Sequence, residues 1–169
     1  MTDRIRQILP QFQLSEDYQD ITLFDNGHIN KTYKITYENG GKKESYVLQG
    51  INSYVFKRPE DVMENIAEIT RYMKQKLKER GGDFERGVLD FLQTQDGKNY
   101  YRDPDGEYWR AYRFIDHSKT YDVISDTKIL YNSGKAFGDF QQILADFPME
   151  KLKETIPGFH DTPKRLRDF

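Results

Sequence analysis

The chain has 169 residues, of which 32% are charged and 14% aromatic, and its formal net charge is -2. The aromatic content argues against disorder, and the small net charge gives no electrostatic reason to expect nucleic acid or an anionic membrane as a partner. Because the sequence has no cysteine, a disulfide framework, a thiolate nucleophile and a cysteine-based zinc site are excluded. No stretch approaches the roughly 18 apolar residues that a membrane span needs, and we expect a cytoplasmic protein.

The first fifty residues predict a short helix followed by a three-stranded antiparallel meander. Residues 3–9 have an amphipathic pattern that ends at Pro10. A strong hairpin turn lies at residues 38–41 (Glu-Asn-Gly-Gly), since Asn and Gly accept a positive φ. Alternating apolar and polar residues and β-rich runs predict strands at residues 21–24, 32–37 and 45–49.

A long helix is expected after the third strand. Pro59 occupies its first turn, and Gly81 and Gly82 end it. Its apolar stripe consists of Val62, Ile66, Ile69, Met73 and Leu77. Two more strands are predicted at residues 88–93 and 108–114, and Tyr100-Tyr101 can pair between them.

The remainder of the chain is expected to be helical. One helix is predicted over residues 126–147, and Pro163 opens another that Asp161 or Thr162 caps. The buried side of the first is expected to contain Ile129, Ala136, Phe137, Phe140 and Leu144. We therefore predict an α+β fold: a lobe of about five antiparallel strands and one helix over residues 1–116, and the first helices of a second lobe over residues 117–169.

The turn between the first two strands is the first candidate binding element. Backbone N–H groups at a tight turn can bind phosphate oxygens, and Gly27 lets the main chain approach a ligand without a side-chain clash. His28 follows, and Asn30 and Lys31 would add a side-chain donor and a positive charge. The alternative is an ordinary hairpin turn, because Asn-Gly is the commonest hairpin signal.

Three further positions are candidates for the same site, each with a plain alternative. Gln49 ends the third strand, where it either donates a hydrogen bond to a phosphate or is a solvated strand residue. Glu64 points away from the apolar stripe of its helix, toward a cleft or toward solvent. The segment Arg113-Phe114-Ile115-Asp116 leaves the last strand and either offers free backbone groups to an adenine edge or simply connects two domains.

Several stretches resemble the aminoglycoside phosphotransferase/choline kinase superfamily, and within it the N-acetylhexosamine 1-kinase group. They are residues 27–33, 46–52, 55–60, 63–66, 109–115, 138–141 and 155–166. The resemblance implies an ATP-dependent kinase that transfers a γ-phosphoryl group to a sugar hydroxyl, with the anomeric hydroxyl of an N-acetylhexosamine as the expected acceptor. It places ATP-binding roles on Gly27, His28, Asn30, Lys31, Gln49, Glu64, Arg113, Phe114, Ile115 and Asp116.

Two departures from the family pattern alter the expected activity. Gln49 stands where kinases have a phosphate-clamping lysine, so the usual lysine–glutamate ion pair is not expected. The sequence also contains no H-x-D-x-x-x-x-N segment, which supplies the catalytic base and a metal ligand in such enzymes. By the resemblance, this catalytic loop is expected to lie beyond Phe169, and no catalytic residue is assigned before it. We therefore expect this chain to bind ATP without transferring phosphate, and Mg²⁺ to act only in a full-length enzyme.

Other functions remain open at this point. The same fold would serve a non-catalytic module that binds a nucleotide or a partner protein, or an enzyme whose acceptor is choline, homoserine or an aminoglycoside. Apolar residues of the second lobe, among them Phe137, Phe140, Leu144 and Phe159, are expected to be partly exposed. Such a surface predicts self-association.

Overall fold

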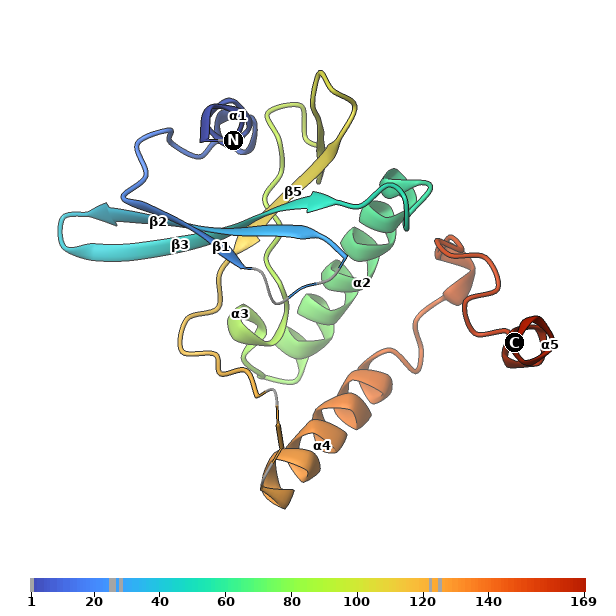
Figure 1. Cartoon of the computed structure of the whole chain (residues 1–169). Helices are drawn as coiled ribbons and strands as arrows, with labels where there is room; N and C mark the ends of the chain where they lie inside the picture. The colour runs from blue at the N-terminus through green and yellow to red at the C-terminus, as the bar shows by residue number, and fades with distance from the viewer. Residues whose placement is uncertain (1, 25–26, 28, 122, 125) are drawn as a thin grey trace.

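The computed structural model describes residues 2–24, 27, 29–121, 123–124 and 126–169. The protein is α+β, and its five-stranded antiparallel sheet has the order β1-β2-β3-β5-β4, which confirms the expected class and strand number (Figure 1). The strands are β1 (Asp20–Phe24), β2 (Lys31–Asn39), β3 (Lys42–Ile51), β4 (Tyr101–Arg102) and β5 (Tyr108–Arg113). The helices are α1 (Thr2–Ile8), α2 (Pro59–Glu79), α3 (Phe84–Gly87), α4 (Thr127–Ile143) and α5 (Thr162–Asp168), with 3₁₀ turns η1 (Leu9–Phe12) and η2 (Met149–Lys151).

The predicted hairpin between β2 and β3 forms at the predicted turn. Gly40 and Gly41 have φ values of +58° and +82°, a conformation in which a side chain would be strained. Two consecutive residues with positive φ give a turn whose twist matches that of the flanking strands. The turn therefore sets the register of β2 and β3, in which Tyr33 faces Leu48 and Ile35 faces Tyr46.

The larger core lies between the sheet and the N-terminal helical segment. The segment contributes Ile5, Ile8, Leu9 and Phe12, and the sheet contributes Ile35, Leu48, Trp109 and Ala111, all of them buried. Burying an aliphatic or aromatic side chain of this size contributes about 1.5–3 kcal/mol. The predicted amphipathic helix forms, and with the following turn it covers one face of the sheet (Figure 1).

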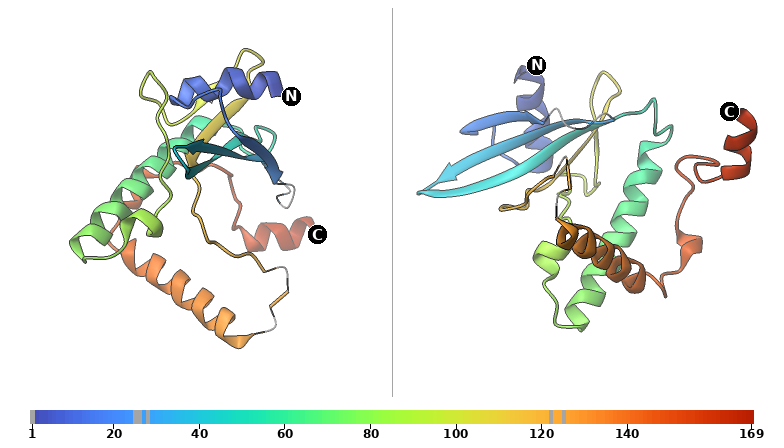
Figure 2. Two further views of the ribbon diagram at one scale, coloured as in Figure 1. Left: turned by 90° about the vertical axis from the view of Figure 1, so that its left-hand side faces the viewer. Right: turned by 60° about the horizontal axis from the view of Figure 1, so that its bottom comes forward.

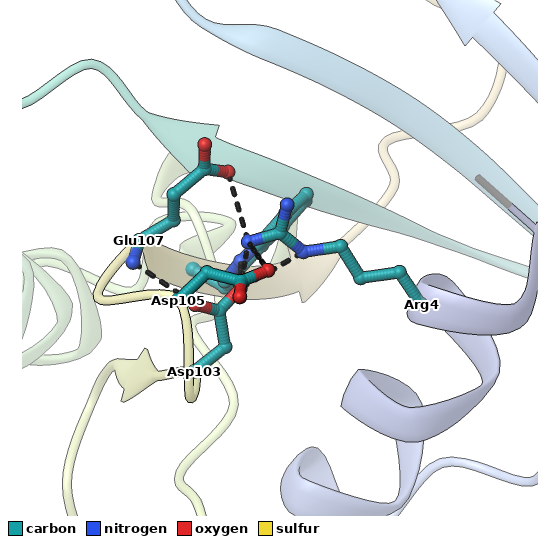
Figure 3. Close-up of polar contacts among 5 residues, drawn as sticks. Arg4, Asp103, Asp105 and Glu107 are labelled. Atoms are coloured by element: carbon teal, nitrogen blue, oxygen red, sulfur yellow. Dashed lines mark hydrogen bonds and ion pairs between the residues drawn. The ribbon is translucent and has the colours of Figure 1, made fainter.

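A charged cluster fixes α1 to the turn between β4 and β5. Arg4 donates through Nε to Oδ2 of Asp103 at 3.0 Å, and its Nη2 lies 3.3 Å from Asp105 and 3.2 Å from Glu107 (Figure 3). The Asp103 side chain is only 3% exposed and also accepts the indole N–H of Trp109 at 2.8 Å. Burial alone would raise the pKa of Asp103, but the hydrogen bonds from Arg4, Trp109 and the Glu107 amide lower it below its ordinary value.

Helix α2 packs on the opposite side of the sheet from α1 (Figure 1). Its most buried side chain is Met63, which contacts a second core with Ile51 and Tyr108. The predicted apolar stripe from Val62 to Leu77 is half-buried. The first turns of the helix make the sheet contact, since Met63 and Ile66 pack with Ile51 and Tyr108.

Residues 88–93 do not form the predicted strand. The structure has the short helix α3 just before them and a single bridge between Phe91 and Tyr112. Two backbone hydrogen bonds accompany it, from Leu92 to Ala111 and from Arg113 to Asp90, both 2.9 Å. Because β4 occupies the first part of this edge of β5, only the second part is left for residues 90–92, and the fifth strand of the sheet is β4 instead.

The C-terminal segment contacts α2 through a few side chains, and the left view of Figure 2 shows α4 on the side of the sheet away from α1. Tyr72 of α2 makes an edge contact with Phe147, whose ring centroid is 5.1 Å away. The side of α4 that was expected to be buried is not covered here: Ala136, Phe137 and Phe140 are exposed, whereas Ile143 and Phe147 are buried. The exposure of Phe137, Phe140 and Phe159 confirms the expectation that apolar residues of this part are partly exposed.

Helix α5 begins where its capping residue was predicted. Asp161 accepts the backbone N–H of Lys164 at 2.9 Å and so caps the helix. Phe169 follows the last residue of α5, and its backbone N–H donates to the carbonyl of Arg165 at 3.1 Å. The Phe169 side chain is exposed and adds nothing to either core.

No helix in the described part of the chain is both long enough and apolar enough to cross a membrane.

Candidate functional site

A row of four side chains crosses the side of the sheet that faces α2. Phe24 lies opposite Thr32, Thr32 opposite Gln49, and Gln49 opposite Arg110 in the registers of neighbouring strands. Because directly opposed residues project to the same face of a sheet, the row lies on one side of it. The next row on this face contains Lys34, Val47 and Tyr112. On this face, the polar residues Thr32, Gln49 and Arg110 therefore lie beside a second row that contains Val47 and Tyr112.

Three members of this row, Arg110, Gln49 and Thr32, form a continuous chain of hydrogen bonds. Arg110 donates through Nε and Nη2 to the single oxygen Oε1 of Gln49, at 2.9 and 2.7 Å. The amide nitrogen of Gln49 in turn donates to Oγ1 of Thr32 at 2.7 Å. Thr32 lies at the start of β2, so the chain runs from the inner strand β5 toward the glycine turn. It fixes the orientation of both the amide and the guanidinium.

Arg110 is a half-buried cation with a neutral environment. Its Nη1 points to the sulfur of Met63 at 3.7 Å, and its guanidinium lies 5.7 Å from the centre of the Phe91 ring. Among the described residues no carboxylate lies within ion-pair distance of it. Burial lowers the pKa of the Arg110 guanidinium, since the charged form loses hydration. In the part of the chain that the structure describes, this face therefore carries the charge of Arg110 without a carboxylate beside it.

The glycine turn is attached to the end of β3 by two asparagines. Oδ1 of Asn30 accepts the backbone N–H of Asn52, and the Asn52 side chain donates to the carbonyl of Ile29, both at 3.0 Å. Asn30 therefore holds the turn through its side-chain oxygen, and its amide N–H groups donate to no residue that the structure describes, so the expected side-chain donor stays a prediction. Gly27 has no positive φ, and a Cβ there would come no closer than 3.9 Å to the protein. His28 lies outside the described residues.

Lys31 is placed on the other face of the sheet from Gln49. Odd-numbered residues of β2, Lys31 among them, project toward α1, whereas Thr32 projects toward α2. The side chain lines a pocket of about 210 Å³ together with Gly50, Asn52 and Glu107. The predicted grouping of Lys31 with Gln49 is therefore corrected, because adjacent strand residues project to opposite faces.

Glu64 is exposed and is paired with the C-terminal segment. It makes an ion pair with Lys153, whose Nζ also lies 3.2 Å from Asp61 of the same helix. Asn65 completes the contact, since its side chain accepts the Lys153 amide at 2.9 Å and donates to the Lys153 carbonyl at 2.7 Å. Gln49 and Glu64 have separate partners, and the structure does not bring them together.

The segment from Arg113 to Asp116 is only partly free to bind a ligand. The Phe114 amide donates to the Ser45 carbonyl at 3.0 Å, and the Asp116 carbonyl accepts from Arg86 at 3.1 Å. No hydrogen bond joins the backbone of Ile115 to any other residue that the structure describes. The Phe114 ring lies on the α2-facing side, 4.1 Å from Nζ of Lys34 and 6.2 Å from the Phe24 ring.

A pocket of about 200 Å³ adjoins this segment. It is lined by Glu85, Arg86, Val88, Asp90 and residues 113–116. The side chain of Arg113 turns to the other face of the sheet, where its guanidinium lies 5.7 Å from the Tyr46 ring. Phe114, Ile115 and Asp116 therefore remain candidates for binding a planar ligand, whereas the Arg113 side chain lies on the opposite face of the sheet from Arg110.

The catalytic loop expected beyond Phe169 is not among the 169 residues of the sequence. Its position therefore stays a prediction from the resemblance. The segment that leads to Phe169 is α5, whose basic side chains are exposed and make local contacts: Lys164 pairs with Asp168 at 2.7 Å, and Arg165 donates to the Phe159 carbonyl at 2.9 Å. These contacts stabilise the helix and its preceding loop, and they assign no catalytic role to either residue.

Arg110 is the candidate that the sequence reasoning missed. The signal was present, because Arg110 interrupts the aromatic and apolar run Tyr-Trp-Arg-Ala-Tyr at residues 108–112. Arg110 becomes a candidate only when the register of β3 and β5 is known, because that register places it opposite Gln49. In the described part of the chain, no group of three or more His, Asp or Glu side chains is placed to hold a metal ion. A scan of the sequence against models of known protein families finds no match.

Proposed function

We propose that this chain is the nucleotide-binding part of an ATP-dependent kinase that phosphorylates a sugar hydroxyl. The observation that carries the proposal is the hydrogen-bonded row of Arg110, Gln49 and Thr32, which ends beside the glycine turn. Phosphate binding needs oriented donors and positive charge, and this row contains both. The order of three strands, a helix and two strands is also that of a kinase small lobe.

The base would lie farther along the same face of the sheet. Val47 and Tyr112 form the row next to Gln49 and Arg110, and Phe114 follows where β5 ends. An apolar surface beside a segment with unpaired backbone groups is typical of a site for a planar heterocycle. In this arrangement the phosphates extend toward the glycine turn and the adenine toward Ile115. Gln49 and Phe114 keep the roles that the resemblance gave them, and Arg110 joins them.

The identity of the acceptor rests on the sequence resemblance of residues 155–166 to N-acetylhexosamine 1-kinases. This stretch carries α5 and a loop that lines an open hollow of about 450 Å³, which includes Phe159, His160 and Asp161. An N-acetylhexosamine would be the first acceptor to examine in any longer form of the protein. The 169 residues contain no H-x-D-x-x-x-x-N segment, and for them we propose nucleotide binding without phosphoryl transfer.

Isothermal titration of the purified chain with ATP, with and without Mg²⁺, tests the proposal. We expect binding in the micromolar to millimolar range, about −8 to −4 kcal/mol, that changes little when Mg²⁺ is added. Adenosine and inorganic tripolyphosphate, titrated separately, divide the affinity between the base and the phosphates. A chain that is folded by circular dichroism and shows no heat with ATP would refute the nucleotide site.

One observation favours a second candidate, a non-catalytic nucleotide-binding module. Glu64 is held by Lys153 on the outside of α2 and does not reach Gln49, so the pair that positions the phosphates in an active kinase is not assembled. The two candidates differ in a longer form of the protein. A kinase would consume ATP when N-acetylhexosamine is added, and a binding module would not.

A further inference from the structure

The partial burial of the Arg110 guanidinium is energetically unfavourable unless a ligand supplies a negative charge or hydrogen-bond acceptors. A guanidinium shielded from water needs an opposite charge or a full set of hydrogen-bond acceptors. Here two of its N–H groups share one amide oxygen, and a third points at a thioether, which is a weak acceptor. The fold therefore leaves its hydrogen-bonding capacity and its charge only partly satisfied.

The residues around Arg110 hold the guanidinium in place. Gln49 accepts from Nε and Nη2 together, which fixes the plane of the group, and Thr32 fixes the Gln49 amide through its nitrogen. Phe91 and Met63 flank it. A planar donor whose orientation is set before binding is suited to a phosphate group, which it can contact through two parallel hydrogen bonds.

From this geometry we propose that Arg110 supplies the positive charge that binds a phosphate group of the nucleotide, and that Gln49 is the positioning residue that orients it. The proposal rests on the proposed function, because it concerns the same site. Gln49, an uncharged amide, stands where kinases have a phosphate-binding lysine. Arg110 lies directly opposite Gln49 on β5 and would supply the positive charge in its place. Lys31, the other candidate cation near the turn, projects to the other face.

The test compares ATP and adenosine binding to the whole chain and to Arg110→Gln. Loss of the charge should weaken ATP binding by about tenfold or more, which corresponds to about 1.4 kcal/mol, and leave adenosine binding unchanged. Arg71→Gln is the matched control, since Arg71 is an exposed arginine on α2 that pairs with Glu68. It should bind ATP as the unmodified chain does.

The outcomes separate the two proposals. If the unmodified chain binds ATP and Arg110→Gln binds it within about twofold, the role of Arg110 is refuted and the nucleotide site stands. If the unmodified, folded chain binds neither ATP nor adenosine, the nucleotide site itself is refuted, and the role of Arg110 with it. If adenosine binding falls as much as ATP binding, Arg110 maintains the site's structure and does not contact phosphate.

A second measurement covers the case in which Arg110→Gln does not fold. The chain is labelled with ¹⁵N-arginine, and the Nε–H signal of Arg110 is assigned from its loss in Arg110→Lys. Saturating ATP or inorganic tripolyphosphate should shift this signal, and adenosine should not. A signal that stays in place with ATP bound would overturn the proposal. Arg110→Lys, which keeps the charge and loses the planar fork, should retain more ATP affinity than Arg110→Gln.

Discussion

Replacing Asp103 by alanine should destabilise the protein more than any other change in the β4–β5 turn. The carboxylate is 3% exposed and accepts from Arg4 at 3.0 Å, from the indole of Trp109 at 2.8 Å and from the Glu107 amide at 2.9 Å. Without it, the indole N–H is left buried with no acceptor, which costs about 1–3 kcal/mol. Arg4 is 34% exposed, so water and the nearby Asp105 can compensate part of its loss.

These contributions share one carboxylate and are not additive. Removing one partner of a buried ion pair costs about 3–5 kcal/mol, and the partial exposure of Arg4 places this case near 3 kcal/mol. For a chain of this length each kcal/mol lowers Tm by about 2–4 °C, so Asp103→Ala should melt about 6–12 °C lower.

Urea denaturation followed by far-UV circular dichroism measures the change. Fluorescence is less suitable, because Trp109 is the only tryptophan and Asp103 contacts it directly. The control is Asp105→Ala in the same turn: Asp105 is 76% exposed and 3.3 Å from Arg4, so its loss should cost less than about 1 kcal/mol. Equal destabilisation by the two variants would refute the reasoning that burial of the carboxylate decides the effect.

Two further predictions concern the same contacts and the C-terminal segment. Because the pKa of Asp103 is lowered in the folded state, its stabilising effect is complete above the ordinary aspartate pKa of about 4 and is lost as the pH falls through the lower folded-state value. Unfolding free energies of the unmodified chain and Asp103→Ala should therefore converge in acid, and parallel curves would contradict this. Lys153→Ala removes the ion pairs to Glu64 and Asp61 and should raise the hydrogen-exchange rate of the position-153 backbone amide, which donates to Asn65, by about fivefold after correction for the intrinsic rate, from about 1 kcal/mol of local stability. The exposed Lys151→Ala is the control, and equal exchange rates in the two variants would show that the Lys153 ion pairs do not hold this segment.

Local sequence signals predicted the elements that depend on local physics. The hairpin at Gly40 and Gly41, the start of α2 at Pro59 and the cap of α5 at Asp161 each follow from backbone preferences of a few residues. The alternation of Tyr33, Ile35 and Tyr37 predicted a strand with one buried face, and all three are buried. Such signals are independent of what the rest of the chain does.

The errors concern contacts between distant segments. Residues 88–93 have the composition of a strand, but β4 pairs with Tyr108 and Trp109, and only the bridge from Phe91 to Tyr112 forms farther along the same edge of β5. The partner of Glu64 is Lys153, 89 residues away, which no local pattern indicates. Arg110 was missed for the same reason, since it becomes a candidate only when β3 and β5 are aligned. The sequence therefore predicted the positions of the helices and strands better than the contacts between them.

The attachment of α1 also determines when this protein can fold during synthesis. Arg4 and its main partner Asp103 are 99 positions apart, and the apolar side of α1 packs against Trp109. At about 5–20 residues per second, the ribosome needs several seconds to deliver β5 after α1 has emerged. Until β5 is made, the core cannot close around four apolar side chains of this segment: Ile5, Ile8, Leu9 and Phe12. Helix α1 is thus made well before β5 and reaches its final place only after β5 is complete, which leaves an apolar surface that a chaperone could bind in the interval.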